Sequence, residues 1–173
     1  MARDPKKMNG AYWNMKEFFL NFMGNYWFWS AFSSWGISQI IKLFTGVFKE
    51  RKWTLRAMLF GSGGMPSAHT AAAVGLTTSL VVTHGTESPL PIITGMIAIV
   101  IMTDAMAVRL ESGRHSRFLN RMVDEGREPE PEDGKRFQTL LGHTFAQVSV
   151  GFAIGVASAL LLSLVPFPAF TFK

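Results

Sequence analysis

The sequence predicts an all-α integral membrane helical bundle with about four transmembrane helices and an N-terminal amphipathic segment. Of its 173 residues, 48% are hydrophobic and only 17% are charged, which is more apolar than a typical soluble domain. Four stretches each supply about 20 mostly apolar residues, enough to cross a bilayer. The alternative is a soluble bundle of fully buried helices, but four such stretches would leave too little polar surface to cover its core.

Two regions are expected along the chain. Residues 1–25 form an N-terminal interfacial segment, in which Met15–Met23 mixes aromatic and charged residues and suits a helix lying among lipid headgroups. Residues 26–173 form the membrane domain. Its first span, Tyr26–Phe48, is rich in aromatic residues and contains one base, Lys42.

The other three predicted spans are more uniformly apolar. Pro66–His84 contains no Lys, Arg, Asp or Glu, and Thr144–Val165 contains no ionisable residue. Pro89–Val108 contains a single carboxylate, Asp104. A lone acid inside an apolar span is costly unless it is paired or functional, so Asp104 is a candidate site residue.

The distribution of Lys and Arg predicts the orientation. These residues follow the first and third spans, whereas the loop between the second and third has none. Because basic loops tend to stay in the cytoplasm, we expect a multi-pass protein whose basic loops face that side. The basic N-terminal tail fits only if the first span is re-entrant or the tail lies flat. The acidic segment around 122–136 contains Pro and Gly and is expected to be a mobile loop.

The sequence Gly63-Gly64-Met65-Pro66-Ser67-Ala68-His69-Thr70 opens the second span. Pro66 suits the first position of a helix that starts near Ser67. The first amide groups of such a helix have no partner within it and attract anions, so Ser67 and His69 would project toward a bound anion. A helix cap and an interfacial histidine are the simpler interpretation of this stretch alone.

A second histidine, His143, occupies the same kind of junction at the start of the fourth span, on the same side of the membrane. Histidine can attack phosphorus and can protonate a leaving oxygen, so His69 and His143 in a basic pocket could transfer a phosphoryl group without metal. The bases available to neutralise a phosphate are Lys42, Arg51, Lys52, Arg56 and Arg109.

Three motifs, GGMPSAH, DAMAVR from Asp104 to Arg109, and LGHT from Leu141, together resemble the divergent branch of the type 2 phosphatidic acid phosphatases. These enzymes are related to vanadium haloperoxidases and bacterial acid phosphatases. The resemblance covers roughly residues 39–155. It implies that residues 26–173 form a membrane phosphatase-like domain that needs no cofactor and no metal.

The resemblance also implies roles for individual residues. Ser67 would bind phosphate, His69 would protonate the leaving group, and His143 would be the nucleophile that forms a phosphohistidine. For the basic residues two sets remain open. Lys49 and Arg56 have the spacing of the superfamily's first motif, whereas the divergent branch is similar to this chain at Gln39, Lys42 and Arg51.

The sequence departs from the superfamily after the nucleophile. Gln147 stands four residues after His143, where the superfamily has a carboxylate; an amide can orient the ring but supplies no charge. Asp104 could substitute for that carboxylate, or it could pair with a loop arginine. Five positions along an α-helix differ by about 140°, so we do not expect a pair between Asp104 and Arg109. The superfamily's third motif also has an arginine six residues before the nucleophilic histidine. Arg136 lies seven residues before His143, so Arg109 is the preferred substitute for that arginine.

The sequence therefore predicts a membrane-embedded lipid phosphate phosphatase. Phosphatidic acid, phosphatidylglycerol phosphate and polyprenyl phosphates or diphosphates all remain open as substrates, so the bond hydrolysed is that of a phosphomonoester or a diphosphate. The alternative is a non-catalytic protein that binds lipid phosphate or acts as a scaffold, and a transporter subunit is a weaker third. The expected partners are the bilayer and the lipid, without nucleic acid. Gly151, Gly155 and Ala159 place small residues on one face of the fourth span, for close helix packing or for homo-oligomer formation.

Overall fold

The structure is a computed structural model that describes residues 15–45, 65–129, 131, 136–137, 139 and 142–166. Every regular element in these ranges is a helix, which confirms the predicted all-α fold. The elements are α1 (Met15–Met23), α2 (Tyr26–Phe44), α4 (Ala68–His84), α5 (Pro89–Thr103), the π-helical turn η2 (Asp104–Val108), α6 (Arg109–Asp124) and α7 (Phe145–Leu162).

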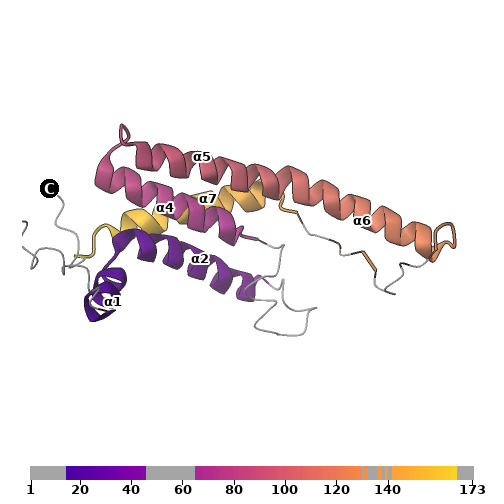
Figure 1. Cartoon of the computed structure of the whole chain (residues 1–173), viewed down its shortest axis with the longest axis horizontal. Coiled ribbons are helices and arrows are strands. Elements are labelled where there is room, and N and C mark those ends of the chain that lie inside the picture. Colours follow the sequence, from indigo (N-terminus) through magenta and orange to yellow (C-terminus); the bar gives the residue numbers. More distant parts are fainter. Residues whose placement is uncertain are drawn as a thin grey trace, which may run out of the picture.

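Helix α4 is the centre of the bundle. It packs against α2, α5 and α7, and α2 also packs against α7 (Figure 1). Helix α4 runs antiparallel to α2 and α5 and parallel to α7 (Figure 1). In this arrangement the N-terminal ends of α4 and α7 lie at the same end of the bundle as the C-terminal end of α5 (Figure 1).

The chain stays helical where the sequence predicts a loop. After Val108 the helix continues without a break to Asp124, so α5, η2 and α6 form one helix of 36 residues, about 54 Å long. Helix α6 is polar but contains no proline, and its end is followed by Gly126 with a φ of 67°. The expectation of a loop directly after Val108 is therefore wrong, because a polar segment stays helical where no residue breaks the helix. Figure 1 shows α6 projecting beyond the bundle.

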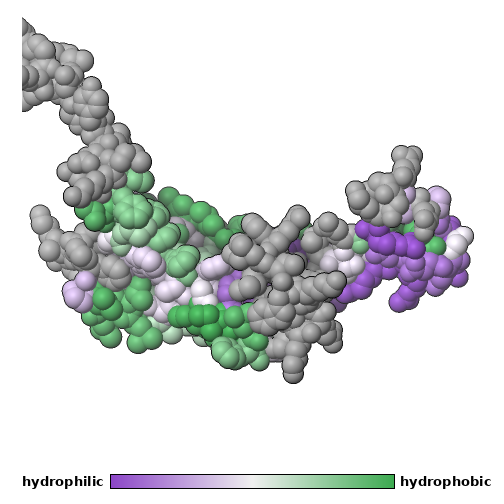
Figure 2. Space-filling view, turned by 90° about the horizontal axis from the view of Figure 1, so that it is seen from below, coloured by the Kyte–Doolittle hydropathy of each residue, from purple (hydrophilic) through white to green (hydrophobic). Residues whose placement is uncertain are grey.

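Two helices in the described ranges are long and apolar enough to cross a membrane. They are Pro89–Asp124 and Phe145–Leu162, each with a mean hydropathy of 2.0 in its most apolar window. Only 17% and 28% of these windows are buried inside the protein, unlike the core helix of a soluble fold. Figure 2 shows a hydrophobic surface over the bundle and a hydrophilic one over the projecting end. These features fit a helical membrane protein.

The small residues of α7 pack inside the bundle. A Cβ atom added to Gly151 would lie 2.5 Å from the Ser67 carbonyl oxygen, and one added to Gly155 would lie 2.6 Å from that of Ala71. Ala159 has no exposed surface. The prediction of close helix packing is confirmed, but this face is covered by α4 and is not a free surface for homo-oligomer formation. Self-association remains a prediction without an assigned surface.

A column of small polar residues on α2 faces the same interior. Ser30, Ser34 and Ser38 recur every fourth residue and have no exposed surface. Ser34 and Ser38 donate to the carbonyl oxygens four residues earlier, at 2.6 and 2.9 Å, so their hydroxyl groups are satisfied within the helix. The next residue of the column is Lys42, which is only 3% exposed. The periodicity of α2 therefore directs a base into the bundle.

Candidate active site at the ends of α4 and α7

Ser67 caps α4 and joins it to α7. Its Oγ atom accepts hydrogen bonds from the Thr70 amide at 3.4 Å and from the Thr70 hydroxyl at 2.9 Å. The helix begins at Ala68, so Pro66 precedes the cap. The prediction that Pro66 occupies the first helical position is therefore wrong. The Ser67 amide donates to the Gln147 carbonyl oxygen at 3.0 Å. This bond holds the two helix N-termini together.

Gln147 fixes the orientation of the His143 ring. Its Oε1 atom accepts from the Thr144 amide at 2.9 Å and lies 3.2 Å from Nδ1 of His143. A backbone N–H can only donate, so the Gln147 atom between these two groups is the amide oxygen. That oxygen can bond Nδ1 only if Nδ1 carries the proton. In the neutral ring, Nε2 therefore holds the free electron pair.

The turn η2 holds the backbone of His143. The His143 amide donates to the Ala105 carbonyl oxygen at 2.8 Å, and His143 is only 6% exposed. Gly142 lies so close to α6 that an added Cβ atom would be 2.5 Å from Cα of Leu110. Only a residue without a side chain fits there, so the segment before α7 is pressed against the start of α6.

Asp104 pairs with Arg109, contrary to the expectation from α-helical geometry. The Nε atom of Arg109 donates to Oδ2 of Asp104 at 2.6 Å. The reason is η2: the Arg109 amide bonds to the Asp104 carbonyl, the i to i+5 pattern of a π-helix, so the two residues lie one turn apart on the same face. Asp104 therefore contacts Arg109, and Gln147, not Asp104, contacts the ring of His143.

The environment of His143 favours its neutral form. Burial lowers the pKa of its imidazole, and the positive charges of Lys42 and Arg109 and the neighbouring His69 lower it further. The hydrogen bond to Gln147 opposes these effects. A neutral ring at physiological pH is the form that can act as a nucleophile.

The structure brings six of the predicted site residues together. His69 is exposed at the start of α4, where the charges of Arg109, Lys42 and Asp104 act on it. These four residues lie with His143 and Ser67 at one end of the bundle, which gives the six residues Lys42, Ser67, His69, Asp104, Arg109 and His143. Two further predicted phosphate ligands, Arg51 and Arg56, lie outside the described residues, as does Lys49.

Arg136 takes no part in this cluster. It pairs with Asp124 at the far end of α6, with 2.9 Å between Nη2 and Oδ1. Asp124 lies 15 residues beyond Arg109, a rise of about 22 Å along the helix. Arg109 therefore stays the predicted substitute for the arginine of the superfamily's third motif.

Three parts of the site were missed in the sequence. The Ala105 carbonyl and the contact of Gly142 with Leu110 depend on the tertiary fold and leave no local signal. The third, the capping box of Thr144 and Gln147, could have been recognised, because Thr144-Phe145-Ala146-Gln147 matches the pattern S/T-x-x-E/Q. Across the described ranges, no group of three or more His, Asp or Glu residues is placed to hold a metal ion.

The chain resembles a known protein family along most of its length. The chain is 32% identical over 139 residues to the "Uncharacterized membrane protein YuiD" of Bacillus subtilis (strain 168), an alignment that covers 73% of this chain and 86% of the relative. No solved structure matches the chain. The sequence pattern of the Divergent PAP2 family matches residues 23–158, which include every described residue of the site. The chain therefore belongs to the Divergent PAP2 family and is a phosphatase-like membrane protein.

Proposed function

We propose that the protein is a multi-pass membrane enzyme that hydrolyses a lipid phosphate through a phosphohistidine on His143. The observation that carries this proposal is the tautomer imposed by Gln147. It leaves Nε2 of a buried, neutral imidazole with a free electron pair, beside a second histidine that comes from another helix. A nucleophile and a proton donor at one anion-binding site are the groups that phosphoryl transfer requires.

The proposed reaction has two steps. Nε2 of His143 donates its electron pair to phosphorus, and the bond from phosphorus to the lipid oxygen breaks. The leaving oxygen keeps the electron pair of the broken bond and takes a proton from His69. Water then attacks the phosphohistidine and gives a proton to His69, while the bond from phosphorus to Nε2 breaks. The products are inorganic phosphate and the dephosphorylated lipid, and both histidines return to their starting states.

Charge at the site favours a phosphate. Lys42 and Arg109 supply two positive charges against the single carboxylate of Asp104. The α4 N-terminus adds the partial positive charge of its first amide groups. Ser67, whose Oγ atom contacts the amide and the hydroxyl group of Thr70, remains a predicted phosphate ligand from the family resemblance. Arg51 and Arg56 remain predicted ligands from the family resemblance.

Position along the helices favours a lipid substrate. Asp104 and Arg109 lie where the apolar α5 passes into the polar α6, which is the level of lipid headgroups if α5 spans the bilayer. The positive-inside tendency would place this end on the cytoplasmic side. The arrangement of α2 and α4 beside the two apolar helices supports four spans.

The test is phosphate release from vesicles that contain phosphatidic acid, phosphatidylglycerol phosphate or a polyprenyl phosphate, measured with purified protein in the presence of a chelator. His143→Ala should abolish release, and His69→Ala should slow it by about 100-fold or more, the usual contribution of a positioned proton donor. His115→Ala is the matched control, because His115 is an exposed histidine on α6. Acid-labile, base-stable labelling of His143 by radioactive phosphate would identify the intermediate.

A second candidate is a protein that binds lipid phosphate without turning it over. The observation in its favour is that Gln147 is uncharged and so does not stabilise an imidazolium as a carboxylate would. Lipid phosphate binding that depends on Lys42 and Arg109, with no phosphate release from any of the three lipids, would establish this candidate in place of the enzyme.

A further inference from the structure

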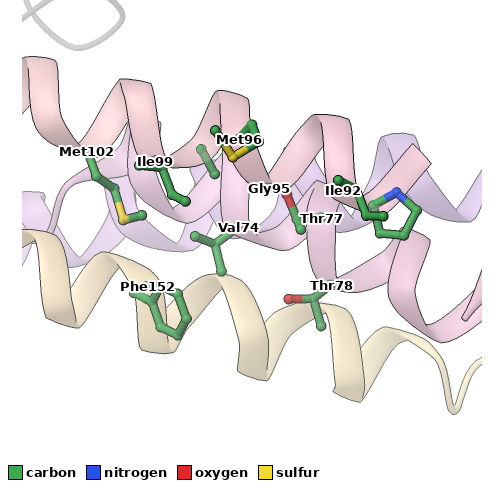
Figure 3. Close-up of a pocket in the computed structure, with 11 residues that line it drawn as sticks. Val74, Thr77, Thr78, Ile92, Gly95, Met96, Ile99, Met102 and Phe152 are labelled. Carbon is green, nitrogen blue, oxygen red and sulfur yellow. The ribbon is translucent and has the colours of Figure 1, made fainter. Parts of the chain in front are cut away.

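An apolar groove of about 380 Å³ opens between α4, α5 and α7 (Figure 3). Its floor is formed by Val74 of α4 and Ala98 of α5, which are 4% and 3% exposed. Its rim includes Met96 of α5 and Phe152 of α7, which are about half exposed. Figure 3 shows the α5 side chains on one side of the groove and Phe152 on the other. The groove is therefore closed at its floor and open at the lipid-facing surface.

The side chains that line the groove are mostly apolar. Val74, Ile92, Met96, Ile99 and Met102 are aliphatic or thioether side chains. Two threonines from α4 complete the wall, and the hydroxyl group of Thr77 is already bonded to the Ala73 carbonyl oxygen at 2.9 Å. A polar ligand would lose its hydration here without compensation, whereas a hydrocarbon chain would lose nothing.

One end of the groove adjoins the candidate active site. Met102 comes two residues before Asp104, and Val74 comes five residues after His69, which are rises of about 3 Å and 7.5 Å along their helices. From Met102 the groove follows α5 back to Ile92, ten residues and about 15 Å away. It thus leads away from the charged cluster along the two helices.

The charged cluster and the apolar groove together indicate the kind of ligand that fits. A cluster with more positive than negative charge lies at one end, and an apolar channel open to the bilayer continues from it. An amphiphile with a phosphate at one end of a hydrocarbon chain satisfies both parts. We propose that the groove holds a hydrocarbon chain of the lipid whose phosphate binds beside His143. This inference rests on the proposed function and extends it, because it makes chain length a determinant of the substrate.

Gly95 provides the test. It lines the groove, and a Cβ atom added there would lie 3.7 Å from Cγ2 of Thr77, an ordinary contact. A leucine at this position should therefore be accepted by the helix while its side chain fills the groove. Gly36 on α2 is the matched control, since an added Cβ atom there would meet nothing within 4 Å and Gly36 does not line the groove.

The first measurement compares kcat/KM for dioleoyl and dihexanoyl phosphatidic acid in mixed micelles. The wild type should prefer the long chain. Gly95→Leu should reduce the ratio of the two values at least about tenfold, the loss expected when a few methylene groups are excluded from an apolar site. Gly36→Leu should keep the wild-type ratio. An unchanged ratio in Gly95→Leu, or equal loss on both substrates, would overturn the proposal.

The second measurement does not require turnover, so it separates failure of the groove from failure of the proposed function. Phosphatidic acid with a diazirine in its acyl chain is photolysed with the protein, and the attached peptides are identified by mass spectrometry. Labelling should fall on α5 between Ile92 and Met102 and on α7 near Phe152, and Gly95→Leu should suppress it. Labelling elsewhere, or a native dimer that Gly95→Leu dissociates, would show that a hydrocarbon chain is not the occupant.

Discussion

Arg109 donates to Asp104 across 2.6 Å although the two residues are five positions apart in one continuous helix. The π-helical turn between them makes this possible, and the same turn offers the Ala105 carbonyl oxygen to the His143 amide. One local irregularity therefore sets the position of both Arg109 and His143. Irregular turns of this kind often occur at functional sites.

Asp104 should act through Arg109. The side chains of Arg109 and Asp104 are 42% and 36% exposed, so the ion pair contributes only a modest free energy. Asp104→Asn should therefore lower kcat/KM about fivefold, which corresponds to about 1 kcal/mol. In an Arg109→Gln background the same substitution should have no further effect, because the group that it positions is gone. A double-mutant cycle on kcat/KM measures this coupling. Additive losses would mean that Asp104 touches the substrate by itself.

The pH profile should report the protonation of His143, the proposed nucleophile. Only neutral His143 can attack phosphorus, and burial holds its pKa below the ordinary histidine value of about 6.5. Activity should therefore persist as the pH falls through 6.5, and the acid limb of kcat/KM should lie lower. Lys42→Met removes one positive charge that lowers this pKa, so the acid limb should move upward. Arg117→Met, at an exposed position of α6, serves as the control and should leave the limb in place.

Gln147 should be needed for the orientation of the ring. Gln147→Leu removes the acceptor for both His143 and Thr144. Loss of the contact with the ring should lower kcat at least about 100-fold. Loss of the capping box should lower the free energy of unfolding by about 1 kcal/mol. Thr144→Ala removes only the cap on the Gln147 amide and should cause a similar loss of stability with much smaller loss of kcat. Equal losses of kcat in the two variants would assign Gln147 to the helix cap alone.

Gln147→Glu gives the complementary change. A carboxylate would still accept from Nδ1 and from the Thr144 amide, and its negative charge would stabilise the imidazolium form. The pKa of His143 should rise, so the acid limb of kcat/KM should shift to higher pH while kcat increases. A pH titration of phosphate release checks both effects. A shifted limb without a gain in kcat would mean that charge on the histidine does not limit the chemical step.

The close packing of α7 against α4 should leave no room for a methyl group at Gly151. Gly151→Ala places a Cβ atom against the Ser67 backbone oxygen, which belongs to the cap of α4 and has little room to move. Overpacking of this kind costs about 1–3 kcal/mol. Gly36→Ala, with open space at its Cβ position, should instead be neutral or stabilising by up to about 1 kcal/mol. Unfolding of the two variants in the same detergent gives the comparison, and equal stability would contradict the close contact.

The sequence by itself determined the elements and the chemistry on offer. Continuous apolar stretches gave helices that begin close to the predicted bounds, and α1 occupies the expected Met15–Met23. Hydrophobic pattern and helix caps are local properties, so neighbouring residues suffice to specify them. The same locality explains why Ser67, His69 and His143 could be recognised as a group of candidates before their positions were known.

The tertiary structure alone decided how those candidates meet. Local pattern gave no sign that the helix would continue through 109–124, that Asp104 and Arg109 would share a face, or that the small face of α7 would be covered by α4. The bond from Ser67 to Gln147 and the bond from His143 to Ala105 join residues 80 and 38 positions apart. Such pairings depend on how whole helices pack, because each helix adjusts its ends and turns to the surface of its neighbours.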